Sequence, residues 1–161
     1  MMARLVVGVA EMAVSANQTD EIITHALGSC VGLAMYDPKL HVGGVLHYML
    51  PTSAIDRGKA ANKPCMFADT GVQLLLDELG RLGAAEKARL IVKVAGGAQI
   101  MDERGVFNVG RRNHVALRQI CSRTGILIDA EDVGGTKART LSMEMASGMV
   151  WISSNGNKVQ L

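Results

Sequence analysis

The sequence predicts an α+β fold made mostly of antiparallel strands, and three observations carry this prediction. Short apolar runs alternate with many of the 18 glycines, which is typical of strands joined by tight turns. Only two stretches have apolar residues at helical spacing. Most connections between the strands are too short to hold a crossover helix, so neighbouring strands should run antiparallel. A chain of 161 residues fits one domain, which we expect to span residues 1–161.

The expected strands occupy most of the chain. Each is a short run of apolar residues bounded by glycine or by turn residues. They cover residues 4–9, 22–27, 30–36, 42–50, 89–94, 126–130, 140–145 and 149–153. The turn signal Asp37-Pro38 makes residues 30–50 an antiparallel hairpin, and a second hairpin turns at residues 147–148. Residues 10–21 and 51–64 are expected to be loops, and the last residues to be frayed.

Two helices are predicted, one on each side of a flexible Gly-Gly segment at residues 95–98. In the first, apolar residues recur at helical spacing from Val72 to Leu82, with Asp69 or Thr70 as the N-terminal cap and Gly83 at the end. The second covers residues 109–123 and ends at Gly125. Its apolar face is approximated by Val109, Ala116, Leu117, Ile120 and Cys121.

Composition and charge exclude several classes of protein. The net charge of +2 is spread along the chain and aromatic residues make up only 3%, so neither a basic nucleic-acid surface nor a base-stacking platform is expected. An uncharged stretch such as residues 22–36 is too short to span a membrane, and Glu11 interrupts the apolar run that a signal peptide would need. We therefore expect a cytoplasmic protein without nucleic-acid binding or membrane insertion.

The segment Gly28-Ser29-Cys30 is the most distinctive local feature, because a cysteine follows a Gly-Ser turn and begins a strand. Such a turn would expose the Cys30 sulfur and direct backbone N–H groups near Gly28 and Ser29 outward. Acyl transfer needs both a nucleophile and hydrogen-bond donors for the developing oxyanion. Free cysteines are more often small buried hydrophobic residues, so this feature alone leaves both roles open.

A nucleophilic cysteine needs a base, and the chain has four histidines. His47 lies in an apolar strand that we expect to pair with the strand of Cys30, which would bring the imidazole beside the thiol. The same position also suits a core histidine bonded to a backbone carbonyl. His41 and His114 are expected near the surface, and His25 does not share a face with the sulfur.

Metal and cofactor sites are not expected. Cys30, Cys65 and Cys121 are widely spaced, and no Cys-x-x-Cys or His-x-x-x-His pattern occurs, so zinc is disfavoured. The odd number of cysteines also argues against a disulfide framework. Cys65 and Cys121 fit packing roles. The Gly-rich segment at residues 95–98 lacks the Lys-Ser/Thr pair of a phosphate-binding loop.

A series of ordered motifs resembles the CheD family, the chemoreceptor glutamine deamidases of bacteria and archaea. The resemblance covers residues 7–153 and rests on Thr24-x-x-Leu27-Gly28-Ser29-Cys30-Val31, Met35-Tyr36-Asp37, Gly43-Gly44-Val45-Leu46-His47-Tyr48-Met49-Leu50-Pro51, Phe67-Ala68-Asp69-Thr70, Lys93-Val94-Ala95-Gly96-Gly97-Ala98, Asn108-Val109-Gly110-x-x-Asn113 and Glu131-Asp132-x-Gly134-Gly135 with Ala138-Arg139. The order and spacing of these motifs are far more specific than one Gly-Ser-Cys turn.

The resemblance implies a catalytic trio of Cys30, His47 and Thr24. It also implies a sandwich of mostly antiparallel β-sheet flanked by helices, resembling the fold of toxin deamidases with a cysteine nucleophile. The implied reaction converts specific glutamines of methyl-accepting chemotaxis receptors to glutamate and releases ammonia through a thioester. His47 would take the Cys30 proton or stabilise a pre-formed thiolate. Thr24 would fix the His47 tautomer or contact the substrate.

The implied partners are the cytoplasmic helical bundles of chemoreceptors, as substrate, and a CheC-type phosphatase that regulates the enzyme in some species. Because the target glutamines would be presented on helices, we expect an open groove rather than a deep pocket. The alternative is a docking or regulatory module that binds these partners with little catalysis. A general thiol hydrolase acting on small amides has no support beyond the Cys–His pair.

Overall fold

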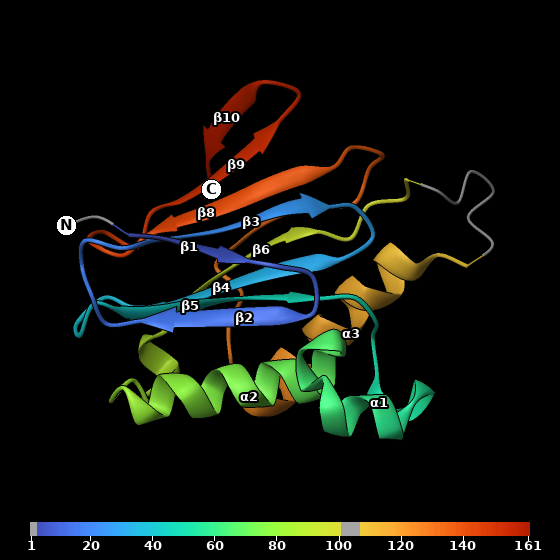
Figure 1. Cartoon of the computed structure of the whole chain (residues 1–161), viewed down its shortest axis with the longest axis horizontal. Helices are drawn as coiled ribbons and strands as arrows, with labels where there is room; N and C mark the ends of the chain where they lie inside the picture. Colours follow the sequence, from blue (N-terminus) through green and yellow to red (C-terminus); the bar gives the residue numbers. More distant parts are fainter. Residues whose placement is uncertain (1–2, 101–106) are drawn as a thin grey trace.

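The computed structural model describes residues 3–100 and 107–161, which form three layers (Figure 1). Two five-stranded sheets pack face to face, and the helices cover the outer face of the second sheet. The strands are β1 (Arg4–Val7), β2 (Glu11–Ser15), β3 (Glu21–Leu27), β4 (Val31–Asp37), β5 (Val42–Tyr48), β6 (Ile91–Gly96), β7 (Ala130–Val133), β8 (Arg139–Glu144), β9 (Val150–Ser154) and β10 (Asn157–Gln160). The helices are α1 (Arg57–Asn62), α2 (Ala68–Arg81) and α3 (Val109–Thr124), with short 3₁₀ turns at Ser53–Ile55, Pro64–Met66 and Lys87–Arg89. The predicted α+β class is confirmed.

The two sheets exchange strands near the N-terminus. The first sheet has the order β1-β3-β8-β9-β10 and the second the order β2-β5-β4-β6-β7. The chain therefore crosses to the second sheet at β2 and returns to the first at β3. The β1–β3 and β6–β7 pairs are parallel and the other pairs are antiparallel, including the predicted β4–β5 and β8–β9 hairpins.

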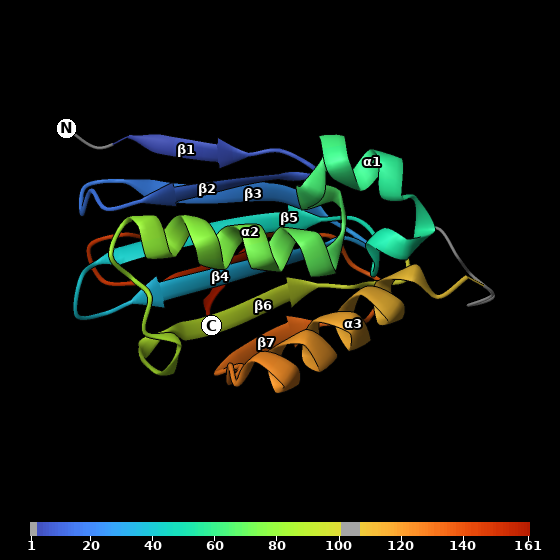
Figure 2. The same ribbon diagram turned by 90° about the horizontal axis from the view of Figure 1, so that it is seen from below.

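Strands β4 and β5 lie at the centre of the molecule and are buried along their whole length. On one face, residues such as Leu33 and Met35 belong to the core beneath α2 and α3 (Figure 2). On the other face, residues such as Ala34 and Val45 belong to the core between the two sheets. Because both faces are covered, these strands are nearly continuous apolar runs instead of alternating ones.

Helices α2 and α3 lie close to their predicted positions. The predicted N-terminal cap of α2 is wrong, because Asp69 lies inside the first turn and accepts hydrogen bonds from Ser53 instead. Gly83 and Gly125 follow the two helix ends, as predicted, with left-handed φ angles of 94° and 74°. Among the described residues, no helix has both the length and the apolar character needed to cross a bilayer.

Two edge strands contradict the predictions, because β2 lies within the expected loop at residues 10–21 and β10 lies in the C-terminal residues that were expected to be frayed. β2 pairs with β5. The mixed sequence of β2 does not by itself indicate a strand, and the strand forms because β5 provides backbone groups to pair with. The exposed strand β10 pairs with β9 across Asn155-Gly156, whose φ angles are 51° and 81°. Asn-Gly is a strong signal for a two-residue hairpin turn, so the sequence did contain the information for β10.

Three further predictions are wrong in detail. Residues 51–64 contain α1 and are not a simple loop. β7 starts at Ala130 and not at Ile126, which follows the C-terminal Gly125 of α3 and donates its N–H to the carbonyl of Cys121. Residues 95–98 are not a flexible segment, since the first two belong to the buried end of β6 and the next two donate backbone hydrogen bonds.

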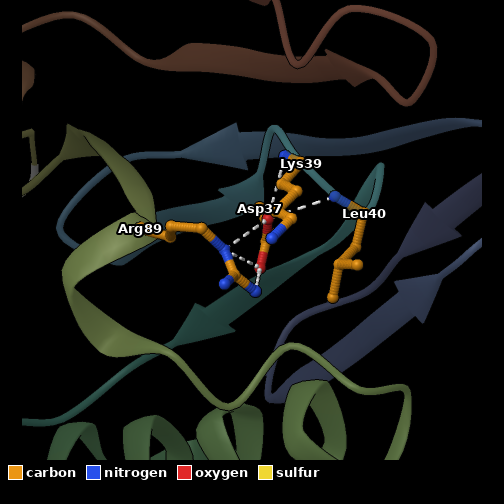
Figure 3. A network of polar contacts seen from close by, with 4 residues as sticks. All are labelled: Asp37, Lys39, Leu40 and Arg89. Carbon is orange, nitrogen blue, oxygen red and sulfur yellow. Dashed lines mark hydrogen bonds and ion pairs between the residues drawn. The ribbon is translucent and has the colours of Figure 1, made fainter.

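Asp37 ends β4 and organises the turn of the β4–β5 hairpin (Figure 3). Its carboxylate accepts hydrogen bonds from the backbone N–H groups of Lys39 (2.9 Å) and Leu40 (3.2 Å) and from the Arg89 guanidinium, at 2.7 Å for the shortest contact. The Asp37 side chain is buried, and its hydrogen bond with Arg89 is the largest cause that lowers the Asp37 pKa. Removing Arg89 would leave a buried carboxylate without its cation, so this pair stabilises the hairpin that carries His47.

Replacing Arg89 by Gln should lower the urea midpoint of unfolding at neutral pH, and the difference from wild type should shrink in acid. The folded-state pKa of Asp37 lies below its unfolded value of about 3.9, so the stabilisation is complete above that value and is lost as pH falls through the folded pKa. Urea unfolding between about pH 7 and pH 3, followed by circular dichroism, measures this difference.

Arg81→Gln is the matched control, because the Arg81–Glu78 ion pair is largely exposed and should affect the midpoint little. A difference between wild type and Arg89→Gln that stays constant over the whole pH range would contradict the role of ionised Asp37.

Candidate active site

Strand register puts Cys30 and His47 on the same face of the second sheet. Gly32 of β4 is paired with His47 of β5, and Cys30 lies two residues before Gly32. Residues two apart on a strand point to the same side, so Cys30 shares the face of His47, and diagonal neighbours of this kind lie roughly 7–8 Å apart. This face is the one between the sheets, where Cys30 packs against the core.

Thr24 reaches the same site from the opposite sheet. Its side chain is fully buried, and its hydroxyl lies 2.7 Å from the Nδ1 atom of His47 and 2.7 Å from the backbone carbonyl oxygen of Val7. A hydroxyl has one hydrogen, and the Val7 carbonyl can only accept. Thr24 therefore donates to Val7 and accepts the Nδ1–H of His47. This fixes the imidazole as the tautomer with an unprotonated Nε2.

Gly32 lies beside the residues that meet between the sheets. A Cβ at position 32 would lie 2.9 Å from a methyl group of Leu27 and 3.5 Å from the methyl group of Thr24. The second distance is ordinary van der Waals contact, and a shift of the flexible Leu27 side chain would relieve the first.

Burial keeps both reacting groups neutral in the resting state. His47 is fully buried, and desolvation lowers its pKa to about 4. Its Nε2 atom has no hydrogen-bond partner within the part of the chain that the structure describes. Desolvation also raises the pKa of the Cys30 thiol, and the Cys30 backbone N–H opposes this rise only in part. Both pKa directions disfavour a pre-formed thiolate paired with an imidazolium.

Three consecutive backbone carbonyl groups accept the hydrogen bonds that hold the turn at Cys30 in place. Those of Gly28 and Cys30 accept hydrogen bonds from the backbone N–H groups of Ala98 and Gly97, both at 2.8 Å. The carbonyl of Ser29 accepts from the side-chain amide of Asn113 at 2.9 Å.

The N–H groups in this turn have different partners. The C=O and N–H of one peptide unit point in opposite directions, so the N–H groups of Ser29 and Cys30 point away from the partners that hold the carbonyls. Neither donates to a backbone carbonyl among the described residues. The N–H of Gly28 already donates to the carbonyl of Ala26 at 3.0 Å, so Gly28 contributes to the turn through its carbonyl. The Ser29 and Cys30 amides are the free donors beside the sulfur.

A cleft of about 410 Å³ opens onto this turn. Its walls are formed by Ala26, Gly28, Ser29, Cys30, Ala98, Gln99, Ile100, Phe107, Asn108, Val109 and Gly110. Two of these residues, Ile100 and Phe107, are large apolar side chains with exposed fractions of 38% and 67%. His47 and Thr24 do not line the cleft. Cys30 is therefore the member of the trio at the boundary between the cleft and the buried base.

The remaining cysteines and histidines lie elsewhere. Cys65 and Cys121 are buried, in agreement with packing roles. His114 contacts Glu131 at 2.8 Å, and His41 contacts the Tyr36 hydroxyl at 2.8 Å, so both are only partly exposed. Within residues 3–100 and 107–161, no group of three or more His, Cys, Asp or Glu side chains is arranged to hold a metal ion.

Asn113 is the site residue that the sequence did not single out for a role. It is buried on α3, on the face that also carries Leu117 and Ile120. The sequence contained a signal for this role, because the polar Asn113 lies four residues before Leu117 and seven before Ile120, on the buried face of the helix. Buried polar side chains usually have specific hydrogen-bond partners.

Comparison with known proteins gives a consistent family. Residues 49–154 match the family model described as CheD chemotactic sensory transduction. A probable chemoreceptor glutamine deamidase CheD of Solibacter usitatus is 46% identical, covering 99% of this chain and 94% of its own length. The probable chemoreceptor glutamine deamidase CheD 1 of Syntrophus aciditrophicus is 43% identical and covers 99% of both chains. The chemoreceptor glutamine deamidase CheD of Thermotoga maritima is 39% identical, covering 97% of this chain and 95% of its own length. The family-model match begins after Cys30 and His47, so it bears on the family and not on these residues.

Proposed function

The chain belongs to the CheD family, and on this premise we propose that it is a chemoreceptor glutamine deamidase in which Cys30 is the nucleophile, His47 the base and Thr24 the residue that fixes the base. The observation that carries the proposal is the buried Thr24–His47 hydrogen bond, which leaves the Nε2 lone pair of His47 free on the face that it shares with Cys30.

The first half of the reaction forms a thioester. The Cys30 proton moves to Nε2 of His47 while the sulfur attacks the side-chain amide carbon of a glutamine. The amide oxygen becomes an oxyanion, which accepts hydrogen bonds from the N–H groups of Ser29 and Cys30. His47 then returns the proton to the amide nitrogen, the carbon–nitrogen bond breaks, and ammonia leaves.

The second half restores the enzyme. Water takes the place of ammonia, gives a proton to Nε2 of His47 and attacks the thioester carbon. The carbon–sulfur bond breaks, the Cys30 sulfur recovers its proton from His47, and the product is a glutamate side chain. Thr24 holds Nδ1–H throughout, so it acts by fixing the His47 tautomer, and the buried position of its side chain does not favour substrate contact.

The surroundings of the cleft support a protein substrate. Its exposed apolar residues Ile100 and Phe107 are typical of a surface that binds another protein. Asn108 lines both the cleft and a neighbouring open groove of about 760 Å³, whose walls include Arg111, Arg112 and Arg123. Within the described part of the chain, these arginines form no ion pair. We expect the receptor helix to place its glutamine at Cys30 and acidic side chains beside this groove.

Three further expectations from the sequence, on domain extent, location and fold relationship, are also proposals. We propose one CheD-like domain over residues 1–161, a cytoplasmic location, and a relationship to the toxin-deamidase fold. Two sheets that pack face to face, with a buried His47 and a partly buried Cys30 on the same inner face, support the last of these. A CheC-type phosphatase remains a partner predicted by the resemblance, and binding to it without any deamidation would indicate a docking module.

Incubation of wild-type protein with receptor cytoplasmic fragments should add about 1 Da at specific glutamines, because a neutral amide becomes an ionisable carboxyl. Cys30→Ala should abolish the mass change. His47→Gln should reduce the rate by about a thousandfold, which is typical of a general acid–base residue. Thr24→Val should cost about tenfold, since the hydrogen bond that fixes the His47 tautomer is lost together with the one to Val7, and Thr24→Ser should keep most of the activity. Peptide mass spectrometry with time points measures all of these rates.

Cys65→Ala is the matched control, because it removes a thiol outside the site and should leave turnover close to wild type. Full activity of Cys30→Ala would refute the mechanism. Absence of any mass change with wild type, combined with binding to a CheC-type phosphatase, would favour the docking module.

Charge removal in the groove should weaken substrate binding without slowing the chemical step. Arg111→Gln/Arg112→Gln should raise KM by about two- to fivefold, leave kcat near wild type and flatten the dependence of KM on salt. Steady-state deamidation at low and high sodium chloride measures both constants.

Lys158→Gln is the control for this pair of substitutions, since Lys158 of β10 lies over the ring of Trp151 of β9, outside both the cleft and the groove. An unchanged KM in the double variant, or an equal change in the control, would contradict the proposed acidic contact.

A further inference from the structure

The side-chain amide of Asn113 bridges the two segments that carry the proposed nucleophile and base. Its Nδ2 group donates one hydrogen bond to the carbonyl of Ser29 at 2.9 Å and another to the carbonyl of Met49 at 2.8 Å. Ser29 immediately precedes Cys30, and Met49 lies two residues after His47. One buried side chain therefore fixes both segments relative to α3.

The contact with Ser29 also determines where an amide hydrogen points. The carbonyl of Ser29 and the N–H of Cys30 belong to the same planar peptide unit and point in opposite directions. Holding this carbonyl toward Asn113 directs the Cys30 N–H away from Asn113, to the side where it supports its own thiol. Cys30 lines the cleft, so an oxyanion formed at its sulfur would lie near this N–H.

Other contacts hold Asn113 itself in place. The Tyr48 hydroxyl donates to the backbone carbonyl of Asn113 at 2.7 Å, which ties α3 to the end of β5. Gly110, one turn earlier on α3, lies so close to the Gly97–Ala98 segment that a Cβ would collide with the Ala98 carbonyl. The donor group of Asn113 thus has little freedom to move away from its two acceptors.

The other end of the same amide adds an independent observation. The Oδ1 atom of Asn113 is buried and has no hydrogen-bond partner among the described residues. A buried polar atom without a partner destabilises a fold. An apolar side chain here would remove that cost but would leave the carbonyls of Ser29 and Met49 without this donor. The amide is therefore needed for the bonds that it makes on the Cys30 side and the His47 side of the site.

We propose that Asn113 is a positioning residue of the deamidase site, which orients the Cys30 N–H and holds Cys30 in register with His47. This inference rests on the proposed function of Cys30 and His47. Asn113 does not touch the substrate in this role and acts through the Ser29–Cys30 peptide.

Asn113→Ala should lower kcat by about tenfold to hundredfold with KM within about twofold, because an oxyanion donor is misplaced while substrate contacts remain. It should also shift the pH dependence of Cys30 alkylation by iodoacetamide to higher pH, since the Cys30 N–H supports the thiolate. Asn113→Ser, which keeps a small donor, should show the same changes in weaker form and provides the readout if Asn113→Ala does not fold.

Leu117→Ala is the matched control, because Leu117 is equally buried on the same face of α3 and has no hydrogen bond to the turn. It should reduce stability but leave kcat per folded molecule and the alkylation profile unchanged. Wild-type kcat in the Asn113 variants, or an alkylation profile that matches Leu117→Ala, would overturn the inference. Failure of wild type to deamidate would instead refute the proposed function, while the alkylation profiles would still test Asn113.

Discussion

The hydrogen bond between Thr24 and His47 is the interaction on which the rest of the site depends. It joins the two sheets, and its direction is set by the single hydrogen of the Thr24 hydroxyl, which the Val7 carbonyl already accepts. This arrangement requires the parallel pairing of β1 with β3, because Val7 is the register partner of Thr24. The unusual crossing of the chain between sheets at β2 therefore has a chemical consequence, namely an imidazole whose free lone pair is on Nε2.

Burial determines how such a pair can work. Desolvation penalises the charged forms of both groups, so it raises the thiol pKa and lowers the imidazole pKa to about 4. A Cys–His pair in this environment does not rest as an ion pair. In the proposed mechanism, the proton moves when a substrate amide fills the cleft and the developing negative charge reaches the N–H groups of Ser29 and Cys30. In that mechanism, a buried base behind a partly accessible thiol also restricts the reaction to side chains that can reach Cys30 at the cleft, which suits a glutamine on a protein surface.

The sequence predicted the local elements better than the contacts between them. The β4–β5 hairpin and both long helices follow from apolar spacing and from turn and stop signals, and the hairpin brings His47 to the strand of Cys30. The edge strand β2 could not be predicted, because its pairing comes from β5 and not from its own residues. The choice between the two roles of Thr24 depended on contact between sheets, which local periodicity does not encode. Asn113 was visible only as a motif residue, since its partners lie more than sixty residues away along the chain.

The most direct test of this account is the protonation state of His47. Nitrogen NMR of protein labelled with ¹⁵N in its imidazoles, assigned by comparison with His47→Gln, distinguishes the two neutral tautomers from the imidazolium. The account predicts a neutral ring with hydrogen on Nδ1 and none on Nε2 from about pH 8 down to about pH 5, because its pKa is near 4. Hydrogen on Nε2, or an imidazolium at neutral pH, would contradict it.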